Sequence, residues 1–153
     1  MVRTGSLVIR LVKATEYAEW LRMRLALWPD HTSEEHRAEM DDILANLSRE
    51  PVFVFVRIGG RLGGFLEASM RNYADGCDTR PVGYIEGWYV DPDLHRQGVG
   101  GELVRAAEAW ALEQGYQEMA SDCEIDNDVS LFAHLALGYK ETERLIHFRK
   151  RIQ

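Results

Sequence analysis

Cysteine is scarce in this chain, and its scarcity excludes two kinds of structure. The 153 residues include only Cys77 and Cys123, and neither belongs to a CxxC pair. A disulfide framework and a zinc site built on paired cysteines are therefore excluded. We interpret both cysteines as ordinary packing or loop residues and predict no metal site.

Long apolar runs are also missing. No stretch approaches the roughly 20 apolar residues that a membrane-spanning helix needs. The first residues, MVRTGSLVIRLVKATE, meet charge too soon after their apolar stretch to form a secretory signal peptide. We therefore expect one domain over residues 1–153, located in the cytoplasm and without a membrane partner.

Basic residues are the minority among the charged ones. The chain has 18 Lys and Arg against 25 Asp and Glu, which gives a net charge of −7 and no basic block. Proteins that select nucleic acid usually present a basic face, so no nucleic-acid partner is expected. The negative field favours cationic ligands instead.

The hydrophobic pattern predicts a mixed α/β domain. Thr32 and Glu35 form a capping box before a helix, and Gly59-Gly60 between two β-rich runs predicts a tight hairpin. The periodicity predicts strands at residues 6–12, 52–58, 62–70, 82–90, 116–123 and 139–150, and helices at 15–28, 33–47, 98–114 and 127–137.

The segment DLHRQGVGGELV joins the strand at 82–90 to the helix at 98–114. Glycines at a helix start leave backbone N–H groups free at its positive end, which is a general anion site. A Walker A loop would need Gly-Lys-Ser/Thr, where this chain has Gly101-Glu102-Leu103, and a dinucleotide fingerprint would need glycine in place of Leu103. Neither motif is present.

Two motifs resemble those of the GNAT superfamily of acyl-CoA-dependent N-acetyltransferases. The segment HRQGVG, residues 95–100, resembles the pyrophosphate loop Gln/Arg-x-x-Gly-x-Gly/Ala, with His95 at the Gln/Arg position. Downstream, Asn127 and Leu137-Gly138-Tyr139 resemble the second signature, with His134 where a tyrosine is usual. Gly87 stands mid-strand, where a glycine often marks a bulge and where this superfamily splays two parallel strands.

The resemblance implies the GNAT fold and acetyl-CoA as co-substrate. This fold has a central mixed, mostly antiparallel sheet with a splayed parallel strand pair and about four flanking helices. The implied coenzyme-binding residues are Trp88, Tyr89, Val90, Arg96, Gln97, Gly98, Val99, Gly100, Gly101 and Asn127.

A narrower resemblance covers nearly the whole chain. LWP (27–29), YADGCD (73–78), EMASD (118–122), ETER (141–144) and the pair Glu86-Gly87 look like the aminoglycoside 6′-N-acetyltransferases of the chromosomal, dimeric type. The resemblance implies acetylation of the 6′-amine, antibiotic resistance and a homodimer. A polycationic sugar needs carboxylates and aromatic walls, and the matching positions that supply them are Trp28, Tyr73, Glu86, Asp122 and Glu143.

No Ser or Cys stands beside a His as a covalent nucleophile would, so we expect direct attack by the amine in a ternary complex. Glu86 is the first candidate for the base and Asp122 the second, unless both only hold the cation. His134 is a candidate proton donor to the leaving thiolate, with packing as the alternative. Two other functions stay open: acetylation of a polyamine, peptide N-terminus or lysine, and a non-catalytic acyl-CoA-binding module.

Overall fold

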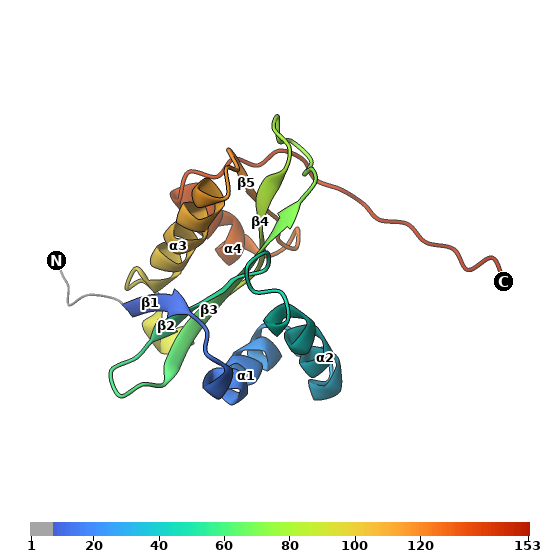
Figure 1. The fold of residues 1–153 in the computed structure, drawn as a ribbon. Helices are drawn as coiled ribbons and strands as arrows, with labels where there is room; N and C mark the ends of the chain where they lie inside the picture. The colour runs from blue at the N-terminus through green and yellow to red at the C-terminus, as the bar shows by residue number, and fades with distance from the viewer. Residues whose placement is uncertain (1–7) are drawn as a thin grey trace.

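The structure, a computed structural model, describes residues 8–153 and contains one five-stranded sheet (Figure 1). Ser6 and Leu7, the expected start of the first strand, lie outside the described residues. The strands are β1 (Val8–Leu11), β2 (Val52–Val56), β3 (Leu62–Arg71), β4 (Val82–Val90) and β5 (Met119–Ser121), and they are neighbours in chain order. The first four pair antiparallel and β5 pairs parallel to β4, as the resemblance implies.

Helices cover both faces of the sheet. A short 3-10 turn, η1 (Ala14–Glu16), leads into α1 (Tyr17–Leu27), which lies with α2 (Ser33–Leu44) on one side, while α3 (Val99–Glu113) lies on the other (Figure 1). The chain also has η2 (Pro92–Leu94) and α4 (Asp128–Ala136). Buried apolar side chains form one core on each face, with Trp20, Met23, Met40, Val54 and Phe65 in the first and Phe55, Leu66, Leu103, Val104 and Ala107 in the second. Within residues 8–153 no helix is long and apolar enough to cross a membrane.

Two local predictions are confirmed at atomic detail. The Thr32 hydroxyl accepts the Glu35 N–H at 3.1 Å and the Glu35 carboxylate accepts the Thr32 N–H at 2.8 Å, so the capping box starts α2. Gly59 and Gly60 have φ of 98° and 94°, which side chains disfavour, and they close the β2–β3 hairpin.

β4 carries an irregularity next to Gly87. Glu67 of β3 pairs with Gly87, but the next residue, Ala68, pairs with Ile85, so Glu86 is the extra residue of a β-bulge. On its other edge β4 pairs with β5 only over residues 83–85 and 119–121. The strands then part, so residues 86–90 pair with no described strand on this edge.

The prediction of a last strand at residues 139–150 is wrong for the single chain. This segment pairs with no strand among residues 8–153. It starts against the body, where Tyr139 bonds Glu108, and its C-terminal part then runs away from the body of the molecule (Figure 1). Its apolar side chains Leu145, Ile146 and Phe148 are 56%, 79% and 89% exposed. A strand needs a neighbour to bond its backbone, and no strand among residues 8–153 supplies one to this segment. The strand expected at 116–123 also shortens to Met119–Ser121.

Candidate active site

The loop before α3 has the backbone of an anion cradle. Arg96 and Gly98 have φ of 66° and 84°, and Gly98 caps α3. The Glu102 N–H donates the first i→i−4 hydrogen bond of α3, to the Gly98 carbonyl at 3.0 Å. The N–H groups of the three preceding residues therefore have no partner within the helix. These donors at the positive end of a 15-residue helix suit a pyrophosphate.

Side chains fix this loop from behind. His95 donates from Nε2 to the Val90 carbonyl at 3.0 Å, and Gln97 donates to the Asp93 carbonyl at 3.0 Å. Asp91, only 7% exposed, accepts bonds from Arg22 and Arg57 at 3.1 and 2.9 Å. Burial raises the pKa of Asp91, but these guanidinium groups outweigh it and hold the pKa below its usual value. The expected Gln/Arg position is thus filled by a histidine that binds backbone.

The open edge of β4 presents alternate backbone groups. The Asp91 N–H donates a hydrogen bond to the Gly63 carbonyl at 2.8 Å. This bond shows which residues of β4 turn their backbone groups toward β3. In an antiparallel pair the groups alternate between the two edges, so the N–H groups of Trp88 and Val90 face the gap toward β5. The N–H of Tyr89 faces β3, so of the three residues expected to bind the coenzyme at this edge only Trp88 and Val90 turn their N–H groups toward the gap.

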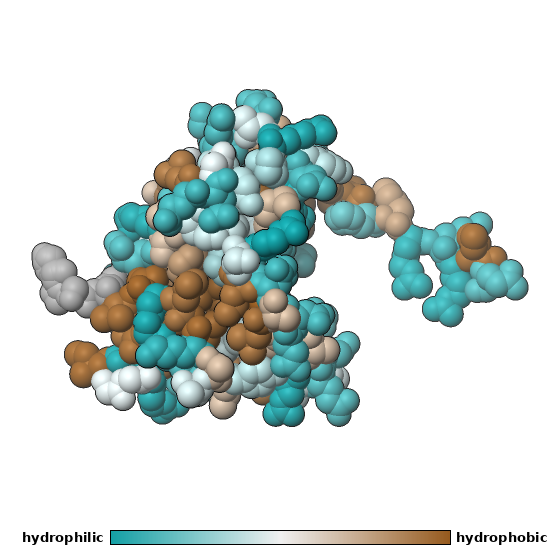
Figure 2. Space-filling model, in the orientation of Figure 1, coloured by the Kyte–Doolittle hydropathy of each residue, from teal (hydrophilic) through white to brown (hydrophobic). Residues whose placement is uncertain are grey.

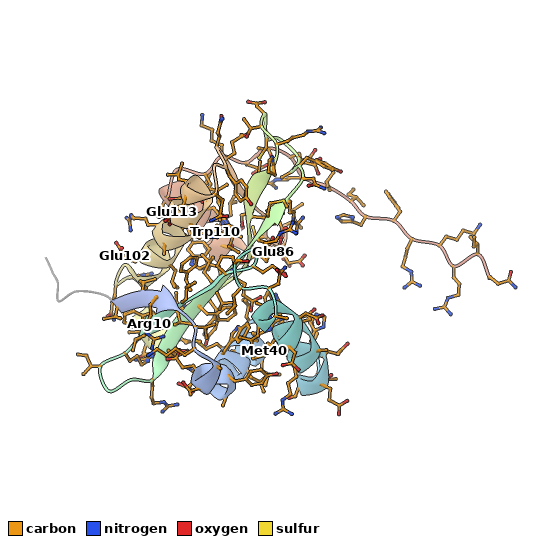
Figure 3. The ribbon with its side chains drawn as sticks, in the orientation of Figure 1. Arg10, Met40, Glu86, Glu102, Trp110 and Glu113 are labelled. Carbon is orange, nitrogen blue, oxygen red and sulfur yellow. The ribbon has the colours of Figure 1, made fainter. Side chains whose placement is uncertain are left out.

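Glu86 is held in place on β4 by two β3 side chains. Ser69 donates to its carboxylate at 2.5 Å, and Arg71 forms a two-point ion pair at 2.9 and 2.8 Å. Figure 3 shows Glu86 near the centre of the molecule, between the half with α1 and α2 and the half with α3. A pocket of about 400 Å³ opens here, lined by Asn46, Arg49, Glu50, Ser69, Met70, Arg71 and Glu86.

Asp122 belongs to the same group of side chains. Tyr84 donates its hydroxyl to Asp122 at 2.5 Å, and the Arg71 guanidinium lies 3.5 Å from the centre of the Tyr84 ring. Burial and the Asp122 carboxylate raise the pKa of Tyr84 strongly, so the phenol stays a donor. The structure therefore links the two predicted carboxylates through Arg71 and Tyr84, which sequence reasoning missed because the bulge decides which residues meet.

Comparison with known proteins agrees with this geometry. Residues 20–139 match the Acetyltransferase (GNAT) family. The chain belongs to the GNAT acetyltransferase family. A Klebsiella aerogenes relative, aminoglycoside N(6′)-acetyltransferase type 1, is 44% identical over 95% of this chain and 97% of its own. A Serratia marcescens relative of the same name is 41% identical over 86% and 90%.

Solved structures give the same result. One described as AAC(6′)-Iy in complex with the bisubstrate analogue CoA-S-monomethyl-acetylneamine has a TM-score of 0.89 and 37% identity, over 95% of this chain and 99% of that one. AAC(6′)-Ih from Acinetobacter baumannii has a TM-score of 0.89 and 34% identity, over 97% and 100%. The fold and the resemblance inferred from the sequence are confirmed.

Of three further residues expected on the acceptor side of this GNAT domain, one lies at the β4 bulge and two lie elsewhere. Trp28 lies half-buried against Gly87, where an added Cβ would collide with the indole ring. Tyr73 is 60% exposed and faces Arg80, while Glu143 on the C-terminal segment faces Asp75, whose charge raises the pKa of Glu143. Only Trp28 is placed beside the bulge by its contacts.

His134 occupies the tyrosine position of the GNAT signature and is fully engaged. Its Nδ1 lies 2.7 Å from the Ser130 carbonyl, which can only accept, so Nδ1 carries the proton. Nε2 lies 2.8 Å from the Ser121 hydroxyl, which then donates to it. Ser121 lies in the EMASD stretch, but no role of its own was predicted for it from the sequence. A neutral His134 in this arrangement has its N–H on Nδ1, and Nε2, which faces Ser121, has no proton.

Two further positions have structural partners. The Asn127 side chain accepts the Ser130 N–H at 3.1 Å and caps α4, so its contact with the coenzyme stays a prediction. Tyr139 donates to Glu108 at 2.7 Å, and burial raises the pKa of its hydroxyl far above the usual value. Within residues 8–153 no cluster of three or more His, Cys, Asp or Glu is arranged to hold a metal ion.

Proposed function

We propose that this protein transfers an acetyl group from acetyl-CoA to the 6′-amine of aminoglycosides and so confers resistance to them. The main support for the proposal is that β4 borders both the acceptor side and the donor side of the site. β4 has the acceptor carboxylate Glu86 at its bulge, an open edge over residues 86–90, and the α3 loop just beyond its end. A thioester lying along this edge would reach Glu86 with its acyl group.

Donor binding is assigned to backbone groups. The N–H groups before the α3 ladder, from Arg96 to Gly101, would hold the pyrophosphate, and the open edge of β4 would bond the pantetheine arm. Trp88 donates its indole N–H to the Gly100 carbonyl at 3.2 Å and so ties the edge to the loop. The Trp88 and Val90 N–H groups would stabilise the thioester oxygen as it gains charge.

On the acceptor side, Glu86 and Asp122 hold the ammonium groups, and an incoming ammonium shares Glu86 with Arg71. One of these carboxylates, directly or through water, takes the proton from the 6′-ammonium. The freed amine then attacks the thioester carbon and a C–N bond forms. The attacking nitrogen loses its second proton to water, the C–S bond breaks and the thiolate takes a proton. The proposed source of that proton is His134 in its protonated form: Nε2 of the imidazolium gives a proton to the Ser121 hydroxyl, which gives its own to the thiolate.

The test is acetyl-CoA turnover, followed as free thiol, with a 6′-amino aminoglycoside and with its 6′-hydroxy counterpart. Turnover with only the 6′-amino compound supports the proposal. Turnover with polyamines or peptides in place of both would assign another cationic acceptor. Coenzyme binding without turnover on any amine would indicate an acyl-CoA-binding module.

We further propose that the enzyme is a cytoplasmic homodimer. The reaction draws on the intracellular acetyl-CoA pool, and Cys77 and Cys123 are free thiols, as a reducing compartment permits. Support for the dimer comes from exposed apolar side chains on α4, namely Val129, Phe132 and Leu135, and on the C-terminal segment, which Figure 2 shows extending from the body with apolar residues among hydrophilic ones.

A further inference from the structure

Three ionisable side chains lie buried together between α1, α2 and β3, and no step of the reaction uses them. Arg24, His36 and Glu67 are 2%, 0% and 5% exposed. Arg24 donates to Glu67 at 2.7 Å and, from Nε, to Nδ1 of His36 at 3.1 Å. Trp20 donates its indole N–H to Glu67 at 2.9 Å, and Arg24 also pairs with Glu39 at the surface.

This cluster holds Trp28 from several sides. Because Nδ1 of His36 accepts from Arg24, the His36 proton is on Nε2, which donates to the Trp28 carbonyl at 3.1 Å. The His36 and Trp28 rings stack with centres 6.2 Å apart at 23°, and the Arg24 guanidinium carbon lies 4.8 Å from the centre of the Trp28 ring. The indole is thereby pressed onto Gly87, which pairs with Glu67 itself.

Stability alone is a weak reason for such a cluster. Buried ion pairs can often be replaced by apolar groups at no loss, because desolvation offsets their attraction. What directional bonds add is a fixed position for the group they hold. Here that group is an aromatic ring packed on Gly87, the residue that follows the bulged Glu86.

We propose that Arg24, His36 and Glu67 are positioning residues for the acceptor: they fix the Trp28 indole against β4, so that an aminoglycoside ring bound at Glu86 packs on it. The inference deepens the proposed function and rests on it. It predicts that damage to the cluster weakens acceptor binding while donor binding stays intact.

The test uses the full-length His36→Phe and Glu67→Gln variants. The first keeps a stacked ring and loses both hydrogen bonds; the second removes only the charge. Since a misplacement of about 1 Å can cost on the order of 10²-fold, we expect the aminoglycoside KM to rise about tenfold and the acetyl-CoA KM to stay within about twofold. Glu16→Gln is the matched control. Like Glu67, Glu16 accepts two side-chain hydrogen bonds, in its case both from Arg10, at 2.9 and 2.7 Å, but it lies at the other end of α1.

Two readouts separate positioning from general stability. In a Trp28→Ala background, His36→Phe should have no further effect on the aminoglycoside KM. The Trp28 indole N–H signal in NMR, assigned with Trp28→Phe, should broaden or split in His36→Phe and stay sharp in Glu16→Gln. An unchanged signal, or a lower Tm with unchanged KM, overturns the inference. Absence of aminoglycoside turnover in the wild type overturns only the proposed function, since the NMR arm still decides the position of Trp28.

Discussion

At the scale of single residues, Glu86 is both exposed to the pocket and already bonded to Ser69 and Arg71. In the proposed site, removing its charge removes a carboxylate that binds a substrate ammonium. Glu86→Gln and Asp122→Asn should each lower kcat/KM for a 6′-amino aminoglycoside by roughly 10²-fold, with acetyl-CoA affinity unchanged. Steady-state kinetics and calorimetric titration of the coenzyme measure the two effects.

The split between kinetic constants assigns the roles in that experiment. A lower kcat identifies the variant residue as the base, and a higher KM alone identifies a cation ligand. Glu16→Gln again serves as the control carboxylate. Full activity in both site variants would remove Glu86 and Asp122 from the reaction.

Glu67 predicts a pH dependence of stability. Burial raises the pKa of its carboxyl to about 6 from an ordinary value of 4.5, although Arg24 and Trp20 oppose the rise. The folded state therefore binds this proton more tightly than the unfolded state, and the stability gained is full below pH 4.5 and lost as the pH rises through 6. At about 1.4 kcal/mol for each pH unit, the change is about 2 kcal/mol.

Urea unfolding of wild type and Glu67→Gln at neutral and acidic pH isolates this contribution. Acids with lowered pKa, such as Glu19 and Asp91, are present in both proteins and cancel in the difference. The difference in the free energy of unfolding should move in favour of the wild type by about 2 kcal/mol between roughly pH 7 and pH 4.5. A difference that is constant with pH contradicts a raised pKa at Glu67.

At the scale of elements, the turn into α3 depends on the backbone of one residue. Gly98 has φ of 84°, and a Cβ there would meet no neighbour, so only the left-handed conformation requires glycine. Gly98→Ala should strain the turn by about 1–2 kcal/mol and rotate its N–H groups away from the pyrophosphate. We expect acetyl-CoA to bind at least about tenfold more weakly, as measured by calorimetry.

Gly115 supplies a matched control for that change. It has φ of 90°, equally open space around it, and a position just past the far end of α3. Gly115→Ala introduces the same strain without touching the loop, so it should lower Tm and leave coenzyme affinity unchanged. Equal loss of affinity in both variants would mean that the helix, and not the loop, was damaged.

Elements that are determined by residues close together in the chain could be predicted from the sequence. The Thr32 capping box, the Gly59-Gly60 hairpin and the Gly98 turn each depend on neighbours along the chain. The meeting of Arg71 with Glu86 depends instead on strand register and on the bulge, and the Ser121 contact with His134 depends on how α4 lies against β5. Those arrangements are set by packing across the sheet, which periodicity does not report.

At the scale of the whole molecule, the C-terminal segment has the sequence of a strand but no strand beside it in the described part of the chain. β5 has only three residues, and its outer edge is the end of the sheet. Burying a Leu, Ile or Phe side chain gains roughly 1.5–3 kcal/mol, and Leu145, Ile146 and Phe148 are all exposed. A second copy of the chain could bury them together with the apolar side of α4. In the proposed homodimer, the strand pairing predicted for residues 139–150 would be made with the partner chain.

We therefore predict that the apolar residues of the segment decide the oligomeric state. The wild type should sediment at twice the 17.5 kDa of one chain. An Ile146→Asp and Phe148→Asp double variant should shift to the monomer mass, because two carboxylates at the interface oppose its burial. Arg149→Gln is the control, because Arg149 lies in the same segment and is already polar. This variant should stay dimeric. Analytical ultracentrifugation at micromolar concentration distinguishes the outcomes, and a wild type that sediments as a monomer, or a double variant that remains dimeric, rules out this segment as the contact between chains.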